Sequence, residues 1–306
     1  MRQIQQGKSD FETYKNRSFS GFSIPLYMQA LNVNETIDGG DFVKKLQNVI
    51  VKGTLTRGGK EELVLNDNLR NILYLLEIDH PSFEYIRTGS TELMTLRAQA
   101  AGVKHLAFVP LQINLGSVIN LKGNDTFKME VSVNDGFFGN RVDTAASYLQ
   151  MDMMDAVGVE YVTPVLKSLV IPATTEVFSE DLGDGVCQVV IANYDKTAKT
   201  SDVQVLITAD LNSDKMSLND NYLELNSKGL WNQVDKDAYT EKRQNYQLYK
   251  GLELNKVNIN LQLNSANVAA SMNYILFKKY ITNQTLVERA FNMKAKHDFE
   301  NLQRVR

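Results

Sequence analysis

The chain has 306 residues, of which 43% are hydrophobic and 23% charged, and its formal net charge is −3. This composition excludes a disordered or fibrous protein, and the length is that of two domains or of one large sheet protein. Because there is no global positive field to hold nucleic acid, we expect neither genome coating nor a specific nucleic-acid partner.

Cysteine and histidine are scarce in this chain. Cys187 is the single cysteine, and the three histidines are His80, His105 and His297. An intramolecular disulfide is therefore excluded, and too few ligands exist for a structural zinc site of the usual four-ligand kind. We expect no cofactor and no metal site, and we expect Cys187, which lies in an apolar strand pattern, to be a core residue.

The N-terminal stretch, residues 1–22, lacks the apolar segment of a secretory signal. The longest uncharged stretch, residues 105–121, is interrupted by Pro110, Gln112, Asn114, Gly116 and Asn120. A membrane helix of about 20 apolar residues rarely carries such interruptions. We therefore expect a soluble chain in an intracellular or assembly context.

Taken in chain order, segments of alternating apolar and polar residues predict strands in both halves of the chain. Residues that tolerate positive φ separate them, for example Gly58 and Gly59 in an Arg-Gly-Gly-Lys turn. Alternating strands joined by such turns are typical of antiparallel sheets. The clearest predicted strands are residues 49–55, 126–133, 186–192, 203–209, 257–263 and 272–277.

Helical patterns are few. Residues 66–78 carry apolar residues at helical spacing after a cap at Asn66 or Asp67, and a weaker pattern covers residues 144–154. A further amphipathic helix is predicted from residue 285 to the C-terminus, with Val287, Phe291, Ala295, Phe299 and Leu302 on one face. Strands and helices do not alternate regularly, so we expect a mostly β protein with a few helices and not a doubly wound parallel sheet.

Half of the chain is about the size of one eight-stranded sandwich with loops and a helix. We therefore predict two consecutive sandwiches that meet within residues 156–163. The predicted division is an N-terminal arm over residues 1–20, a first sandwich over 21–157, a second over 158–284, and a C-terminal helix or arm over 285–306.

Two stretches partly match known phosphate- and calcium-binding motifs, but each lacks residues that the motif requires. In residues 53–60 an extra glycine precedes Lys60, and Glu61 stands where a phosphate-binding loop needs Ser or Thr, so a hairpin turn is the better interpretation. The alternation of Asp210, Asn212 and Asp214 lacks the glycine and the bidentate carboxylate of a calcium hand, which leaves a polar loop or a weak cation site between subunits. We find no catalytic set and expect no enzyme.

Trp231 lies among tyrosines, namely Tyr222, Tyr239, Tyr246 and Tyr249. Such a cluster suits loop or interface packing, and it also suits a sugar-stacking platform on a β-sandwich binding module. The second interpretation gives an alternative function, a carbohydrate- or receptor-binding sandwich protein of a phage.

The C-terminal stretch is basic, because residues 278–306 carry a local net charge of +4. A basic amphipathic end can lie against an anionic membrane, dock on a neighbouring subunit, or pack on its own domain. The candidate membrane or subunit contacts are Lys278, Lys279, Arg289, Lys294, Lys296, Arg304 and Arg306.

One stretch of about thirty residues, 105–133, has a recognisable order of elements. A strand ends in Pro110-Leu111, an apolar connection includes residues 118–121, and a strongly alternating strand follows over residues 127–131. This stretch resembles the middle of double jelly-roll major capsid proteins of tailless icosahedral viruses with an internal membrane. The resemblance is nearest to the small capsid proteins of lipid-containing phages such as those infecting Flavobacterium. Residues 22–26 echo the opening strand of such a sandwich, whereas Gln112-Ile113 replaces the usual aromatic pair and the connection lacks its usual proline.

The resemblance implies two eight-stranded jelly rolls standing perpendicular to a capsid surface, and a protein that is not an enzyme. It also implies a homotrimer that contacts neighbouring trimers, vertex and minor capsid proteins, and the internal lipid membrane. The implied location is the virion capsid, assembled in the host cytoplasm.

Overall fold

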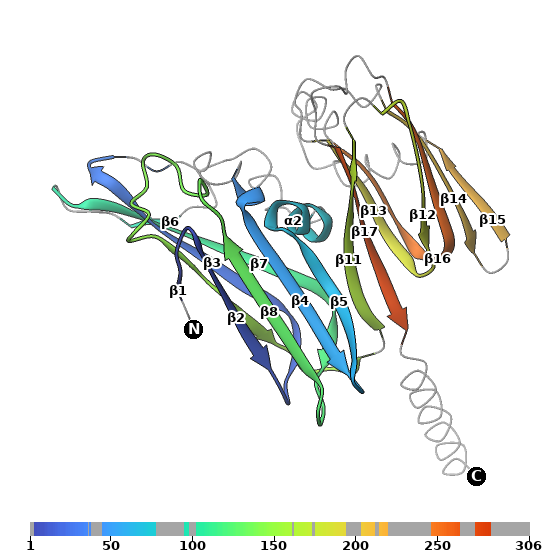
Figure 1. Cartoon of the computed structure of the whole chain (residues 1–306), viewed down its shortest axis with the longest axis horizontal. Helices are drawn as coiled ribbons and strands as arrows, with labels where there is room; N and C mark the ends of the chain where they lie inside the picture. Colours follow the sequence, from blue (N-terminus) through green and yellow to red (C-terminus); the bar gives the residue numbers. More distant parts are fainter. Residues whose placement is uncertain are drawn as a thin grey trace, which may run out of the picture.

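The computed structural model describes residues 3–35, 37, 45–77, 95–97, 102–160, 162–172, 175–193, 203–211, 214–219, 246–263 and 273–282. Two antiparallel β-sandwiches stand side by side, and helix α2 (Leu69–Glu77) lies where they meet (Figure 1). The expectation of a mostly β chain with few helices is confirmed. No helix among the described residues is long and apolar enough to span a bilayer.

Two sheets form the first sandwich. One has the order β1-β9-β3-β7-β6 with β10 also paired to β3, and the other has the order β2-β8-β4-β5. The bounds are β1 Gln3–Ile4, β2 Lys8–Tyr14, β3 Ser18–Val33, η1 Leu46–Asn48, β4 Val49–Arg57, β5 Lys60–Asn68, β6 Thr95–Arg97, β7 Lys104–Asn120, β8 Thr126–Val133, β9 Tyr148–Gln150 and β10 Asp152–Asp155.

In the second sandwich the strand order is β11-β17-β13-β16-β14-β15, with β12 also paired to β16. The first part of the long β16 pairs with β13, and its remainder pairs with β12 and β14, so β16 passes from one layer to the other. The bounds are β11 Val162–Ile171, β12 Val177–Gly183, β13 Val186–Asn193, β14 Val203–Leu211, β15 Asp214–Asn219, β16 Tyr246–Leu263 and β17 Asn273–Thr282.

Strict alternation builds the core of the first sandwich. In β8 the residues Phe127, Met129, Val131 and Val133 are buried, and the residues between them are half-buried. The Phe127 ring lies 5.0 Å from that of Phe19 and 5.4 Å from that of Phe22. Gly53 faces this cluster because a Cβ atom there would lie 2.7 Å from Phe127 Cζ. The three phenylalanines therefore tie the two sheets together.

All six clearest strand predictions are confirmed, with ends that differ by a few residues or, for the fifth, form part of the longer β16. The Gly58-Gly59 turn is confirmed as well, since both residues have positive φ, 52° and 77°. The first predicted helix exists as α2, but it begins only at Leu69 because β5 continues through Asn68. Asn68 Oδ1 accepts the N–H of Asn71 at 2.9 Å, so Asn68 is the cap.

The predicted helix over residues 144–154 is wrong. These residues form a turn followed by β9 and β10. Leu149 and Met151 are buried while Tyr148 and Gln150 are half-buried, which is the two-residue period of a strand. The predicted helix over residues 285–306 lies outside the described residues.

Residues 1–20, predicted as an N-terminal arm, include two strands of the first sandwich. β2 pairs along its whole length with β8 of the same chain, and β1 pairs with β9. β3 begins at Ser18 and runs through the first sandwich. In the structure, this end of the chain therefore belongs to its own sheets.

The two segments that carry the resemblance lie next to each other. β3 and β7 pair so that Ile24 faces Leu111, Pro25 faces Pro110 and Leu26 faces Val109. Neither proline can donate a ladder hydrogen bond, so opposing them in one pair interrupts the ladder at a single place. The likeness in sequence thus corresponds to one paired ribbon at the centre of a sheet.

Candidate functional site: the junction between the sandwiches

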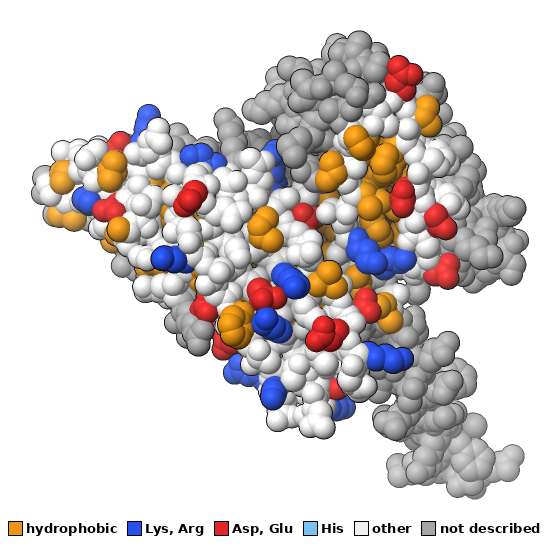
Figure 2. Space-filling view, viewed as in Figure 1, with side chains coloured by type: hydrophobic (Ala, Val, Ile, Leu, Met, Phe, Trp, Pro, Cys, Tyr) orange, Lys and Arg blue, Asp and Glu red, His pale blue; other side chains and the backbone are white. Residues whose placement is uncertain are grey.

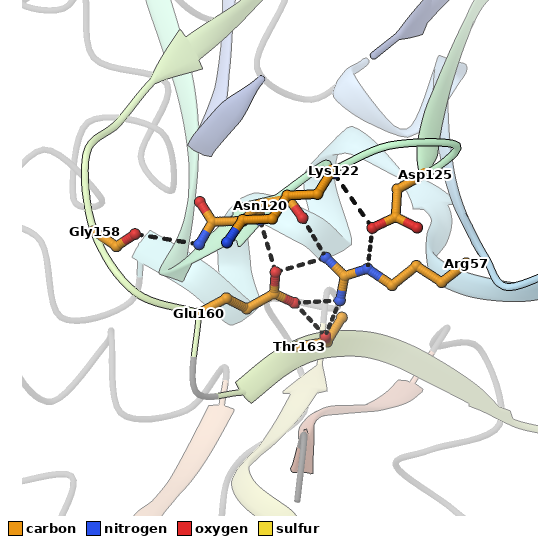
Figure 3. A network of polar contacts seen from close by, with 7 residues as sticks. All are labelled: Arg57, Asn120, Lys122, Asp125, Gly158, Glu160 and Thr163. Atoms are coloured by element: carbon orange, nitrogen blue, oxygen red, sulfur yellow. Dashed lines mark hydrogen bonds and ion pairs between the residues drawn. The ribbon is translucent and has the colours of Figure 1, made fainter. Parts of the chain in front are cut away.

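A buried ion pair joins the two sandwiches. Arg57 ends β4 of the first sandwich, and Glu160 lies in the connection that leads from β10 to β11. The guanidinium donates Nη2–H to Glu160 Oε2 at 2.6 Å and Nη1–H to Glu160 Oε1 at 2.5 Å (Figure 3). Such a bidentate pair fixes both orientation and distance.

Both members of the ion pair make further polar contacts. Glu160, whose side chain is 1% exposed, also accepts the backbone N–H of Asn120 at 2.7 Å and the hydroxyl of Thr163 at 2.8 Å. Arg57 donates further to the Asn120 carbonyl at 2.9 Å, and its Nε lies 3.4 Å from Asp125 Oδ2. Buried charges stabilise a fold only when they are satisfied in this way.

The surroundings of Arg57 favour its protonated, charged form. Burial by itself would lower the pKa of the guanidinium, but the hydrogen bonds and charges of Glu160 and Asp125 outweigh burial and raise it. Since arginine is always protonated, the pair stays ionised on the arginine side at any working pH.

Local turns bring the partners of the ion pair to one place. The Gly58-Gly59 hairpin holds Arg57 at the end of β4, and the turn between β7 and β8 supplies Asp125. The connection itself is bound through its backbone, because Asn120 Nδ2 donates to the Gly158 carbonyl at 3.2 Å. A Cβ atom on Gly158 would lie 3.1 Å from Val118, so this residue allows the connection to lie close to β7.

Helix α2 forms the apolar half of the junction. Buried residues of α2 belong to one continuous core that also includes Leu166, Val190 and Leu276 of the second sandwich. Gln188 of β13 donates its Nε2–H to the carbonyl of Leu75 at 2.7 Å, and thereby satisfies an acceptor near the end of the helix. The sheet that contains β11, β17 and β13 is therefore covered by α2 on the side that faces the first sandwich.

Asp67 is a second polar contact across the junction. Its carboxylate accepts both the backbone N–H of Asn68 at 2.7 Å and the side-chain amide of Asn71 at 2.9 Å, and it is hydrogen-bonded to Ser168 of β11. Burial raises the pKa of Asp67, and these hydrogen bonds oppose the rise without cancelling it.

Of the seven predicted contact residues, the structure places two, both on β17. Lys279 donates to the Leu182 carbonyl at 2.7 Å, and burial together with the charge of Lys167 lowers its pKa. Lys278 points to the other side of the strand, with Nζ 5.3 Å from the centroid of the Tyr280 ring and near Gly116 of β7. The remaining five, Arg289, Lys294, Lys296, Arg304 and Arg306, lie outside the described residues.

The other predicted candidates are Cys187 and the aromatic cluster around Trp231. Cys187 is buried, as expected, and its thiol donates to the Lys278 carbonyl at 3.3 Å. Trp231, Tyr222 and Tyr239, on which the sugar-binding alternative depends, lie outside the described residues. Within the part of the chain that the structure describes, no three His, Cys, Asp or Glu side chains form a group that could hold a metal ion.

The sequence matches no protein-family model and no curated protein. Solved structures do match. The major capsid protein of Sulfolobus turreted icosahedral virus is 11% identical, with a TM-score of 0.54 over 92% of this chain and 94% of that chain. A chain of the atomic structure of the same virus is 12% identical, with a TM-score of 0.53 over 92% and 88%. The major capsid protein P2 from bacteriophage PM2 is 9% identical, with a TM-score of 0.48 over 92% and 94%.

The chain has the fold of a viral major capsid protein. At 11% and 12% identity this likeness is one of fold. The resemblance seen in residues 105–133 is thereby confirmed at the level of architecture over most of the chain. The junction is the part of that architecture that sets how one sandwich stands against the other.

Removing Arg57 tests the ion pair. We expect Arg57→Met to lower the free energy of unfolding by about 3–5 kcal/mol, because Glu160 would stay buried without its counter-charge. The double variant Arg57→Met/Glu160→Met should lose less than the sum of the single variants. Urea unfolding followed by far-ultraviolet circular dichroism measures both.

The matched control is the more exposed pair Lys52–Glu130, whose side chains are 45% and 33% exposed and whose Nζ and Oε2 atoms lie 3.5 Å apart. Lys52→Met should cost less than about 1 kcal/mol, as exposed pairs do. Equal losses for Arg57→Met and Lys52→Met would show that burial of the junction pair does not matter.

Asp67 predicts a pH dependence. Its folded pKa is raised, so the folded chain binds more protons than the unfolded chain between the ordinary value of 3.8 and the raised value. The stability of the wild type relative to Asp67→Asn should therefore rise as the pH falls from neutral through that window.

Asp143 gives a control of opposite sign. The hydrogen bond from Lys104 lowers the pKa of Asp143, so its stabilisation is present above the ordinary value and is lost as the pH falls through the lowered one. Wild type should lose stability relative to Asp143→Asn on acidification. Urea unfolding at several pH values measures both differences, and the same sign for both variants would contradict the assignment.

Proposed function

We propose that this protein is a structural major capsid protein that assembles as homotrimers into an icosahedral shell around a lipid membrane. The observation that carries the proposal is the shared fold over 92% of the chain with a viral major capsid protein. The junction supports it, because a shell subunit must present its contact surfaces at fixed angles. The same site offers no catalytic chemistry, since all groups around Arg57 and Glu160 are engaged in holding one another.

The proposal includes partners. Copies of the chain would contact one another within a trimer and between trimers, and vertex and minor capsid proteins would complete the shell of the virion. We place assembly in the host cytoplasm. Obligate interfaces of this kind bury roughly 2,000 Å² or more, enough to hold a trimer permanently.

The basic C-terminal stretch is proposed to contact the membrane. Arg289, Lys296 and Arg304 fall on the side of the predicted helix opposite Val287, Phe291 and Phe299. Apolar residues can then pack on protein while the cations face anionic headgroups. Lys279 contributes less directly, because its ammonium already binds a backbone carbonyl.

A trimer is the first expectation to test. Size-exclusion chromatography with light scattering should give a species near three times 34.5 kDa that resists dilution and heating. A stable monomer at micromolar concentration would contradict the proposed function.

Vesicle flotation tests the membrane contact. The protein should float with anionic vesicles and not with neutral ones, and 1 M salt should release it. Each cation near an anionic surface contributes on the order of 1 kcal/mol, so changing Arg289, Lys294, Lys296, Arg304 and Arg306 to Gln should reduce binding at least tenfold.

The control changes five exposed lysines elsewhere, Lys8, Lys15, Lys60, Lys122 and Lys167, to Gln. Both variants lose the same charge, so a general electrostatic effect would weaken them equally. Equal weakening, or flotation with neutral vesicles, would count against the C-terminal contact.

A further inference from the structure

One end of the first sandwich has an apolar outer face. Along β3, Met28 and Ala30 point into the core and Tyr27 and Gln29 lie on the opposite face, while Leu31 and Val33 are exposed beyond a register shift that follows Gln29. The register adds Phe108 of β7, which faces Tyr27, and Leu106. Solvated faces of antiparallel sheets are normally polar, and the other end of this face, with Ser23 opposite Gln112, is so.

A hollow of about 420 Å³ lies on this face. Its walls include the rings of Tyr27, Phe108 and Tyr148, with Tyr27 5.0 Å from Phe108 and 4.9 Å from Tyr148 between centroids. Beside it, Leu31 is 43% exposed and Val33 46% exposed. We name this surface, formed by Tyr27, Leu31, Val33, Phe108 and Tyr148, the ribbon end.

A strongly exposed apolar side chain, with acidic residues near it in the chain, lies on the other sandwich. Val177 at the start of β12 is 68% exposed, and the acidic residues Glu176, Glu180 and Asp181, before and along the same strand, are exposed as well. Among the described strands, β12 has one partner, β16, so its other edge is open. We name this surface, Val177 with its three acidic neighbours, the β12 edge.

The two surfaces complement each other in charge. Arg141 is exposed next to the ribbon end, where its carbonyl accepts the N–H of Leu31 at 2.8 Å. The nearby carboxylates are engaged locally, Asp143 by Lys104 at 2.9 Å and Glu35 by Asn32 at 3.0 Å. Figure 2 shows acidic side chains on the side of the second sandwich where β12 lies.

We propose that the ribbon end of one copy binds the β12 edge of a second copy. Val177 would enter the aromatic hollow, and Arg141 would face the acidic residues of β12. The two surfaces differ and lie on different sandwiches, so the contact is head-to-tail and closes into a ring after a fixed number of copies. This inference rests on the proposed function and specifies the surfaces that would form the trimer.

Two variants test the contact by complementation. Leu31→Asp/Val33→Asp disables the ribbon end, and Val177→Asp/Glu180→Arg disables the β12 edge. All four residues are exposed, so both variants should fold, which circular dichroism checks. By light scattering each variant alone should be a monomer, with at least tenfold weaker association than wild type.

Mixing the two variants gives the decisive result. Each retains the surface that the other lacks, so an equimolar mixture should form a species of twice 34.5 kDa and no trimer. Leu63→Asp is the matched control, because Leu63 is 42% exposed on β5 and belongs to neither surface, and it should remain trimeric.

The outcomes separate this inference from the proposed function. A monomeric wild type would overturn the proposed function and this inference with it. A trimeric wild type whose ribbon-end variant stays trimeric would overturn the inference alone. A trimeric β12-edge variant, or a mixture that stays monomeric, would overturn β12 as the binding surface.

Discussion

The fixed angle between the two sandwiches depends on one buried ion pair. Arg57 and Glu160 come from different parts of the chain and meet where Glu160 is closed off from water. Separating the sandwiches would expose a carboxylate whose hydrogen bonds to Arg57, Asn120 and Thr163 are all made within the junction. These contacts favour the docked arrangement, because separating the sandwiches would break the bidentate pair and its supporting hydrogen bonds together.

Apolar packing around helix α2 also holds the two sandwiches together. Helix α2 lies between the sandwiches, and its core is continuous with Leu166, Val190 and Leu276 of the second sandwich. The Arg57–Glu160 pair supplies a polar contact and helix α2 supplies an apolar one, so the two sandwiches are joined by interactions of different kinds. The two described sandwiches are therefore held together by an ion pair and by a shared apolar core.

Local structure was largely predictable from the sequence, and long-range structure was not. Alternation over residues 126–133 predicts β8 to the residue, and the Gly-Gly turn predicts its hairpin. Nothing local marks Arg57 and Glu160 as partners, since they are 103 residues apart and each reads as an ordinary surface charge. A single acidic residue in the otherwise apolar connection Ala-Val-Gly-Val-Glu was the one available sign. The helix predicted over residues 144–154 was wrong because short strands such as β9 offer too few residues for a two-residue period to stand out.

In strands that are buried on both faces, apolar and polar residues do not alternate strictly, so the sequence does not show which face points to the core. β13 packs inward through Val189 and outward through Val190 and Gln188, because α2 covers its outer side. Its sequence accordingly reads as an almost continuous apolar run, as in sheets covered twice. The ribbon end of β3 and β7 has the same signature, apolar residues on both faces, but its outer rings line an open hollow. At the junction, helix α2 of the same chain covers the apolar outer face of β13. At the ribbon end, the proposed second copy would cover the apolar outer face in the same way.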